Sequence, residues 1–177
     1  KRQVQTDGMT QQSVDAYQNA KREAQNESNN ALALINNGDA DEQQITTETD
    51  RVNQQTTNLT QAINGLTVNK EPLETAKTAL QNNIDQVPST DGMTQQSVAN
   101  YNQKLQIAKN EINTINNVLA NNPDVNAIKT NKAEAERISS DLTQAKNNLQ
   151  VDTQPLEKIK RQLQDEIDPV SYTHLRA

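Results

Sequence analysis

The sequence predicts an all-α protein made of two tandem antiparallel three-helix bundles that form an elongated rod. Three observations carry this prediction. Apolar residues recur at spacings of three and four, which lines one face of a helix. A unit of about 84 residues occurs twice. Only 32% of the 177 residues are hydrophobic and 2% are aromatic, so the core must be narrow.

The repeat is plainest in the nine letters TDGMTQQSV, which begin at Thr6 and recur unchanged at Thr90. The copies then keep their apolar positions at an offset of 84 and, after a one-residue deletion, at an offset of 83. Residues that share a position include Tyr17 and Tyr101, Ala24 and Ala108, Ile45 and Ile128, Leu59 and Leu142, Leu73 and Leu156, and Ile84 and Ile167. We therefore expect two modules, at residues 1–88 and 89–170.

The last seven residues, 171–177, read SYTHLRA and break both the composition and the repeat. We interpret them as a tail added by cloning and exclude them from the functional argument.

Each module is expected to contain two long helices and one short helix. In the second module, apolar stripes run over residues 98–119 and 128–149. Pro123 suits the first turn of the second helix, because that position needs no N–H donor. A short helix follows Pro155, and Pro169 is expected to end it.

The first module follows the same plan with fewer large apolar residues. Lys21 and Ser28 stand where the second module has Leu105 and Ile112. Burying one Leu or Ile side chain is worth roughly 1.5 to 3 kcal/mol. We therefore expect the first module to have the thinner core and to unfold first.

The repeated TDGMT segment lies between a short helix and the long helix that follows it. In the second copy, Gly92 can adopt positive φ, Thr94 is placed to cap the long helix, and Met93 precedes the cap as in a hydrophobic staple. Together with Asp91, these residues are predicted to form an inter-module joint. A joint that fixes the angle between bundles tolerates little change, which favours a structural reason for the identity of the two copies.

The sequence contains no recognisable catalytic or metal site, so we expect neither an enzyme nor a cofactor. The only histidine, His174, lies in the tail, and cysteine is absent, which excludes Ser/His and Cys/His nucleophile pairs. Asp39, Asp41 and Glu42 lack the ligand spacing of an EF-hand and are interpreted as acids that favour a helix start. Further polar matches are interpreted as solvated faces or chance: Glu71 with Glu74, Glu134 with Glu136, and the glycosylation triplets at Asn26 and Asn58.

The net charge is −6, and no basic stripe or aromatic cluster accompanies it, which argues against a nucleic-acid partner. No run approaches the roughly 18 apolar residues of a membrane span. We expect the fragment itself to be soluble and monomeric.

The arrangement resembles FIVAR modules, the helical repeats of giant staphylococcal surface adhesins. The resemblance is carried by the short helix LETAKTAL, the turn DGMTQQSV with a tyrosine three residues later, a long helix that ends in Asn-Asn, and a second long helix that ends in LTQAINGL. It covers about Thr6 to Val170. It implies a very long extracellular parent protein attached to the cell envelope, and modules that bind host fibronectin. The family offers no catalytic residues to carry over.

Two alternatives stay open at this point. The helices of one bundle could follow the order long, long, short, as the ends of the chain suggest, or short, long, long, as the FIVAR pattern suggests. The second order would leave the first bundle without its short helix and residues 155–170 without a following pair. In function, the modules either bind fibronectin weakly and gain strength by repetition, or serve as a spacer that projects other regions from the cell wall.

Overall fold

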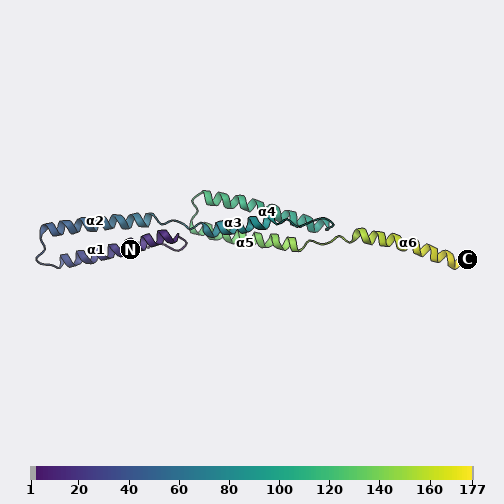
Figure 1. Ribbon diagram of the computed structural model, residues 1–177, viewed down its shortest axis with the longest axis horizontal. Helices are drawn as coiled ribbons and strands as arrows, with labels where there is room; N and C mark the ends of the chain where they lie inside the picture. Colours follow the sequence, from purple (N-terminus) through teal and green to yellow (C-terminus); the bar gives the residue numbers. More distant parts are fainter. Residues whose placement is uncertain (1–2, 177) are drawn as a thin grey trace. The chain divides into compact units, whose positions relative to one another are not determined.

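The computed structural model describes the backbone of residues 3–176 and the side chains of residues 3–168. Within this part the regular structure is helical, which confirms the predicted all-α fold (Figure 1). The helices are α1 (Gln11–Ile35), α2 (Glu42–Asn64), α3 (Glu71–Asp85), α4 (Gln95–Ala120), α5 (Val125–Asn147) and α6 (Gln154–Arg176). The chain divides into two compact units, residues 1–73 with 118–130 and residues 74–117 with 131–177.

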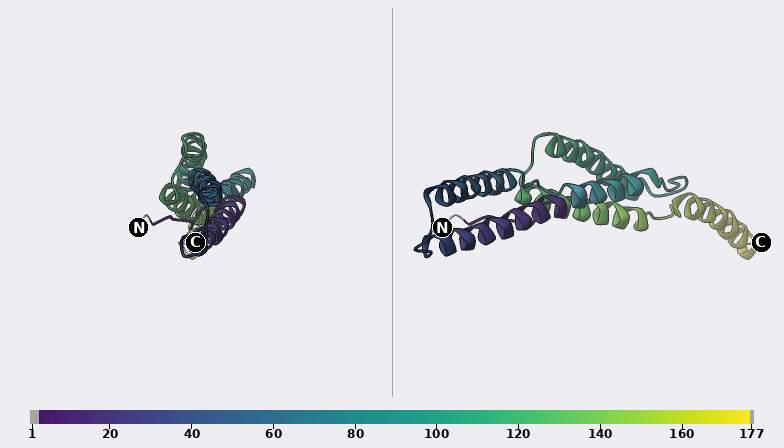
Figure 2. Two further views of the ribbon diagram at one scale, coloured as in Figure 1. Left: turned by 90° about the vertical axis from the view of Figure 1, so that its left-hand side faces the viewer. Right: turned by 60° about the vertical axis from the view of Figure 1, so that its left-hand side comes forward.

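Helices α1 and α2 form an antiparallel hairpin (Figures 1 and 2). The α2 helix begins with a capping box, in which the Asp41 carboxylate accepts from the N–H of Gln44 and the Gln44 side chain accepts from the N–H of Asp41. This confirms the capping role for Asp41, and Glu42 lies in the first turn of α2, where an acid is favourable. Of the side chains on these two helices, Tyr17 and Glu48 are the buried ones.

Helices α3, α4 and α5 lie side by side (Figures 1 and 2), and each buries an apolar stripe. A stripe of this kind is what the three-and-four spacing predicts, because such residues share one helix face. The buried apolar side chains are Leu73, Ala76, Leu80 and Ile84 on α3, Tyr101, Ala108 and Ile115 on α4, and Ile128, Ala135, Ile138, Leu142 and Ala145 on α5.

Polar contacts join α3 to α5 alongside this core. The Asn83 amide donates to the carbonyl oxygen of Ser139 (2.8 Å) and to the Thr143 hydroxyl (2.9 Å). The Lys146 ammonium donates to the side-chain oxygen of Asn83 (2.8 Å) and to the carbonyl oxygen of Gln86 (2.6 Å). Burial lowers the pKa of Lys146, since removal from water disfavours a charged amine.

These contacts follow the order short, long, long. A module boundary after residue 88 would separate α3 from α5, although the two helices are joined by hydrogen bonds. The expected boundaries 1–88 and 89–170 therefore do not coincide with the packing of α3. How the repeats of the parent protein are divided into modules stays a prediction.

Helix α6 continues to Arg176, so the prediction that Pro169 ends it is wrong. A proline in a helix interior removes one hydrogen bond and bends the helix, a cost that the other bonds of a long helix can offset. The side chains of residues 169–177, which include the expected tail 171–177 and His174, lie outside the described residues.

Candidate functional site

The repeated segment forms a tight turn ahead of α4. The N–H of Met93 donates to the carbonyl oxygen of Thr90 (3.2 Å), and Gly92 has a φ of +70°. Glycine reaches that φ readily because it has no Cβ to clash with the backbone. The Thr94 hydroxyl oxygen accepts from the N–H of Ser97 (3.4 Å), which is the bond of a helix N-cap. The conformations predicted for Gly92 and Thr94 are thus confirmed.

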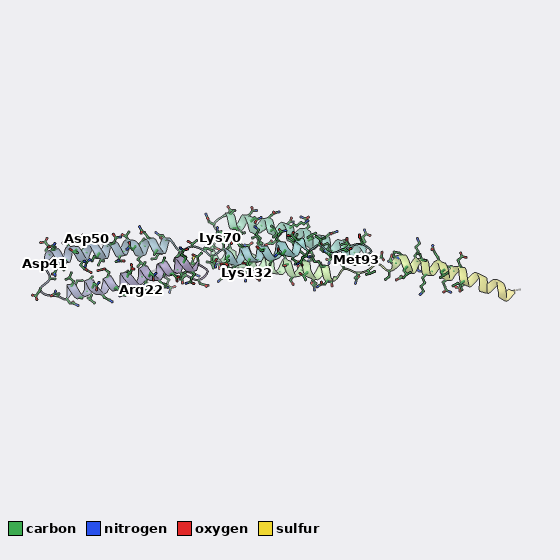
Figure 3. All side chains as sticks on the ribbon, viewed as in Figure 1. Arg22, Asp41, Asp50, Lys70, Met93 and Lys132 are labelled. Carbon is green, nitrogen blue, oxygen red and sulfur yellow. The ribbon has the colours of Figure 1, made fainter. Side chains whose placement is uncertain are left out.

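The turn is also attached to the chain that leaves α5. The N–H of Thr94 donates to the carbonyl oxygen of Gln150 (2.7 Å). Met93, labelled in Figure 3, forms an isolated antiparallel β-bridge with Val151. The start of α4 is therefore fixed to the end of α5, its antiparallel partner. The sequence suggested a hydrophobic staple at Met93 and gave no sign of this backbone bridge.

The first copy of the segment repeats this arrangement ahead of α1. The N–H of Thr10 donates to the carbonyl oxygen of Thr67 (2.7 Å), and Met9 forms the corresponding β-bridge with Val68. Gly8 has a φ of +79°. The same letters thus form a turn, a cap and a bridge in both places. The positive φ of the glycine and the cap formed by the threonine depend on these residue types, which gives a structural reason for their recurrence.

The residues that receive the turn were not expected from the sequence. They lie at positions 67–69, after α2, and 150–152, after α5. In the second of these segments, the N–H of Asp152 donates to the carbonyl oxygen of Gly92 (2.8 Å). A signal for them exists in the repeat, because the chain reads LTVN before α3 and LQVD before α6. Two short segments that recur together point to a mutual contact.

The first turn has a neighbour on its outer side. A Cβ built on Gly8 would lie 2.4 Å from Cγ1 of Val125, so glycine is required there by space as well as by φ. The Lys129 ammonium lies 3.2 Å from the Asp7 carboxylate. All of these residues belong to one compact unit. The turn therefore contacts the connection between α4 and α5.

A second contact involves the same connection. The ammonium of Lys70, in the segment between α2 and α3 (Figure 3), donates to the carbonyl oxygen of Leu119 near the end of α4 (3.0 Å). Because a helix end leaves its last carbonyl groups without partners, a lysine donor there satisfies one of them. Lys70 and the first turn thus approach the α4–α5 connection together.

The second turn differs on its outer side. Among the described residues, nothing lies within 4 Å of a Cβ built on Gly92, and Asp91 is exposed. We therefore propose, by analogy with Asp7 and Gly8, that Asp91 and Gly92 receive the connection between the long helices of a further repeat. Met93 and Thr94 would hold the turn in shape for that contact.

Three glutamates on the long helices have a buried carboxyl oxygen. Glu48 and Glu111 are each 9% exposed, and among the described side chains Oε1 of Glu27, Glu48 and Glu111 is buried without a hydrogen-bond partner. When one of the Glu27 and Glu48 carboxyl groups holds a proton, it can donate to the other, and this hydrogen bond is the main cause that raises the pKa of Glu48, followed by burial and the Glu27 charge, while Arg51 opposes the shift. Burial is the main cause that raises the pKa of Glu111.

Acids with raised pKa values also occur in catalytic sites, but these glutamates are not accompanied by the groups that a metal site would need. In the part of the chain that the structure describes, no group of three or more His, Cys, Asp or Glu side chains could hold a metal ion. The pair of Glu27 and Glu48 joins α1 to α2 across the hairpin. We interpret it as a structural contact whose strength depends on pH.

The other acidic pairs lie on the surface. Glu71, Glu74 and Glu136 are exposed. The Glu134 carboxylate accepts from the Arg137 guanidinium (2.6 Å), a bond that lowers the pKa of Glu134. The exposure of Glu71, Glu74 and Glu136 agrees with their interpretation as solvated faces, whereas Glu134 is half-buried and paired with Arg137. Asn26 and Asn58 lie within α1 and α2, as expected.

The model of the FIVAR domain matches the chain twice, at residues 1–67 and 76–150. The chain belongs to the FIVAR family. The first match contains α1 and α2, and the second contains most of α3 with α4 and α5. The second FIVAR match thus brings together the same three helices that pack against one another.

The chain is also similar to curated proteins of Staphylococcus aureus. It is 52% identical over 170 residues to the extracellular matrix-binding protein EbhB of strain Newman, a match that covers 96% of this chain and 2% of the relative. The extracellular matrix-binding protein ebh of strain NCTC 8325 / PS 47 gives the same identity and coverage. EbhB of strain N315 is 52% identical over 96% of this chain and 4% of the relative. This chain therefore spans only a small part of each.

No solved structure matches the chain significantly. The relatives bear the name of binding proteins, and homology to them confirms the prediction that the chain is not an enzyme. None of the described helices is both long and apolar enough to cross a membrane.

Proposed function

We propose that this chain is a segment of a staphylococcal cell-surface adhesin whose FIVAR modules bind host extracellular matrix, with fibronectin as the partner. The observation that supports the proposal is 52% identity over 96% of the chain to proteins named for matrix binding. The parent protein would be extracellular and attached to the cell envelope. Each module would bind weakly, and repetition along the parent chain would supply avidity.

The chemistry of the surface fits weak binding. The long helices present mostly Asn, Gln, Thr and charged side chains outward, and the chain has no Trp or Phe and three tyrosines. Strong single-site interfaces depend on buried aromatic or arginine anchors. A partner would therefore contact the polar outer faces of the long helices through many small contributions.

The second candidate is a spacer that projects other regions of the parent protein from the cell wall. The observation that favours it is the set of bonds that close each repeated turn, because Thr10 with Thr67 and Thr94 with Gln150 hold long helices in place without any ligand. If the repeated residues are needed for the packing of the module itself, a binding partner is not required to account for them.

The deciding experiment is a titration of the intact chain against immobilised fibronectin and its separated domains, with albumin as the control ligand. We expect saturable binding to one fibronectin region at micromolar concentration. A covalent tandem of two copies should bind the same surface at least about tenfold more tightly, because the second contact becomes intramolecular.

Saturable binding to a different matrix protein, without binding to fibronectin, would support the adhesin proposal but identify a different partner. Absence of saturable binding to any matrix protein at high micromolar concentration, for the chain and for the tandem, would overturn the adhesin proposal. The spacer would then be the better account.

A further inference from the structure

The chain contains two Asn-Gly pairs whose backbones differ. Asn37–Gly38 lies in the connection between α1 and α2, whereas Asn64–Gly65 lies at the end of α2. Both residues of each pair are exposed. An asparagine followed by glycine is prone to lose its side-chain amide spontaneously, because glycine has no Cβ to obstruct attack by its own nitrogen. The two pairs therefore isolate the effect of backbone structure at similar exposure.

The first pair lies in a turn that leaves the glycine nitrogen free. The N–H of Ala40 donates to the carbonyl oxygen of Asn37 (3.2 Å), which closes a β-turn over these residues. Gly38 is the second residue of that turn, and the bond that closes a β-turn does not use the N–H of its second residue. Among the described residues, no group accepts from the Gly38 N–H. This nitrogen can therefore act as a nucleophile without breaking a hydrogen bond.

The side chain of Asn37 is held beside that nitrogen. Its oxygen accepts from the N–H of Asp39 (3.1 Å), a bond that closes a ring of atoms around the Gly38 peptide. Attack on the side-chain carbon would place negative charge on the same oxygen, where a donor already in position stabilises it. The turn thus brings together the nucleophile, the carbon that it attacks and a donor for the developing charge.

The second pair has the opposite arrangement. The N–H of Gly65 donates to the carbonyl oxygen of Gln61 (2.9 Å) and belongs to the last turn of α2. This turn must open before the nitrogen can reach the side chain of Asn64, and local opening of a helix end costs free energy. Asn64 is therefore protected although it is exposed.

The reaction needs only water. The Gly38 nitrogen loses its proton and bonds to Cγ of Asn37, the bond between Cγ and Nδ2 breaks, and ammonia leaves with the proton. One water then opens the cyclic succinimide at either of its C–N bonds. One opening gives aspartate, and the other gives isoaspartate, in which the main chain runs through Cγ. In total, one water is consumed and one ammonia is released.

The product changes the connection in charge and in length. It adds a carboxylate just after α1, where the negative end of the helix dipole disfavours it, and Asp39 and Asp41 already lie close by in the chain. Isoaspartate also adds a methylene to the main chain, which displaces the carbonyl group that accepts from Ala40. The N–H of Asn37 donates to the carbonyl oxygen of Leu34 (3.1 Å), so the change reaches the last turn of α1.

We propose that Asn37–Gly38 is a modification site at which the chain deamidates spontaneously with age, and that isoaspartate formed there loosens the α1–α2 connection. Asn64–Gly65 keeps its amide over the same period. The α4–α5 connection has no Asn-Gly pair, and its Asn122–Pro123 pair cannot react in this way because proline has no N–H. The modification therefore marks the first hairpin and is separate from matrix binding.

The test is incubation of the intact chain in mildly alkaline buffer at physiological temperature. Peptide mapping by mass spectrometry follows each amide, and electron-transfer fragmentation distinguishes isoaspartate from aspartate. We expect Asn37 to deamidate at least about tenfold faster than Asn64, because breaking the Gly65 hydrogen bond costs up to about that factor in rate. In guanidinium chloride the two rates should converge, since both nitrogens are then free.

Two alanine variants form a matched pair. Gly38→Ala should slow the conversion of Asn37 at least about tenfold, because its Cβ obstructs the attacking nitrogen. Gly38 has a φ outside the left-handed region, and among the described residues nothing lies within 4 Å of a Cβ built on it, so this variant keeps the fold. Gly65→Ala is the control and should leave the rate at Asn37 unchanged.

Amide exchange tests the effect on the connection. An aged sample with isoaspartate at position 37 should exchange faster at the end of α1 and the start of α2 than Asn37→Asp, which adds the charge without the methylene. Equal exchange in the two would overturn the loosening. Equal rates for Asn37 and Asn64 in the folded chain, or a ratio that guanidinium chloride leaves unchanged, would overturn the site. None of these measurements involves fibronectin, so they leave the adhesin proposal to its own experiment.

Discussion

The helix pairs α1–α2 and α4–α5 are built on the same repeat, yet they bury their apolar faces very differently. On α1 and α2, Tyr17 and Glu48 are the buried side chains, and Glu48 is an acid. On α4 and α5, eight apolar side chains are buried. Part of the difference is local, because Lys21 and Ser28 replace Leu105 and Ile112. The rest follows from α3, which lies beside the second pair.

This contrast teaches that the repeat specifies helices and their faces, whereas burial depends on which helices are present together. The stripe of α6 makes the same point from the other side, since Leu156 and Leu163 are exposed where Leu73 and Leu80 are buried. A repeat protein of this kind gains stability from contacts between neighbouring elements as well as within them.

The largest expected effect comes from truncating the buried stripe of α3. Leu80→Ala should destabilise the chain by about 2 to 5 kcal/mol, because it removes buried methyl groups and leaves a cavity. Leu163→Ala, the equivalent change on α6, should cost less than about 0.5 kcal/mol at low micromolar concentration, as surface changes do. Urea unfolding followed by circular dichroism measures both. Similar losses for the two variants would contradict the difference in burial.

The two turns provide the next comparison. Gly8→Ala and Gly92→Ala should each lower the free energy of unfolding by about 1 to 2 kcal/mol, because both glycines have positive φ, where the Cβ of alanine clashes with the backbone. Gly8→Ala should cost more, since its Cβ would also lie 2.4 Å from Val125. Thermal unfolding of both variants gives the order. An equal cost would show that Val125 moves away freely and that the contact of the first turn is loose.

The smallest expected effect concerns pH and the α1–α2 hairpin. The pKa of Glu48 is raised in the folded chain, so the folded form holds its proton to higher pH than the unfolded form. The stabilisation is complete below the unfolded pKa and is lost as pH rises through the folded pKa. Glu48→Gln should therefore stabilise the hairpin at neutral pH and flatten its pH dependence.

Amide exchange of α1 and α2 at several pH values, corrected for intrinsic rates, measures this change. Glu71→Gln, at an exposed position on α3, is the control and should leave the pH dependence as it is. A hairpin whose protection in Glu48→Gln still falls from mildly acidic to neutral pH would exclude Glu48 as the responsible group.

Much of this structure could be predicted from the sequence. The apolar spacing predicted the helices, and the letters of the turn predicted the φ of Gly92 and the cap at Thr94, because these features depend on neighbouring residues. The Asp41 cap is local in the same sense. Such features need no knowledge of the partner helices.

The features that the sequence did not predict depend on distant contacts. The β-bridge of Met93 with Val151 joins segments on either side of the α4–α5 pair, and no local pattern announces it. The grouping of α3 with α5 depends on side chains such as Asn83 and Lys146 meeting in space. Both long and short helices have a single apolar stripe, so the stripe alone left the order of the bundle open. The prediction that α6 ends at Pro169 failed because a proline can bend a helix as well as end it.

The most direct test of the central claim, that a third helix decides which pair of long helices is firmly packed, is native-state amide exchange of the intact chain at low micromolar concentration. We predict strong protection in α3, α4 and α5, weaker protection in α1 and α2, and the least in residues 154–168 of α6. Equal protection of α3 and α6, or of α1–α2 and α4–α5, would contradict the account.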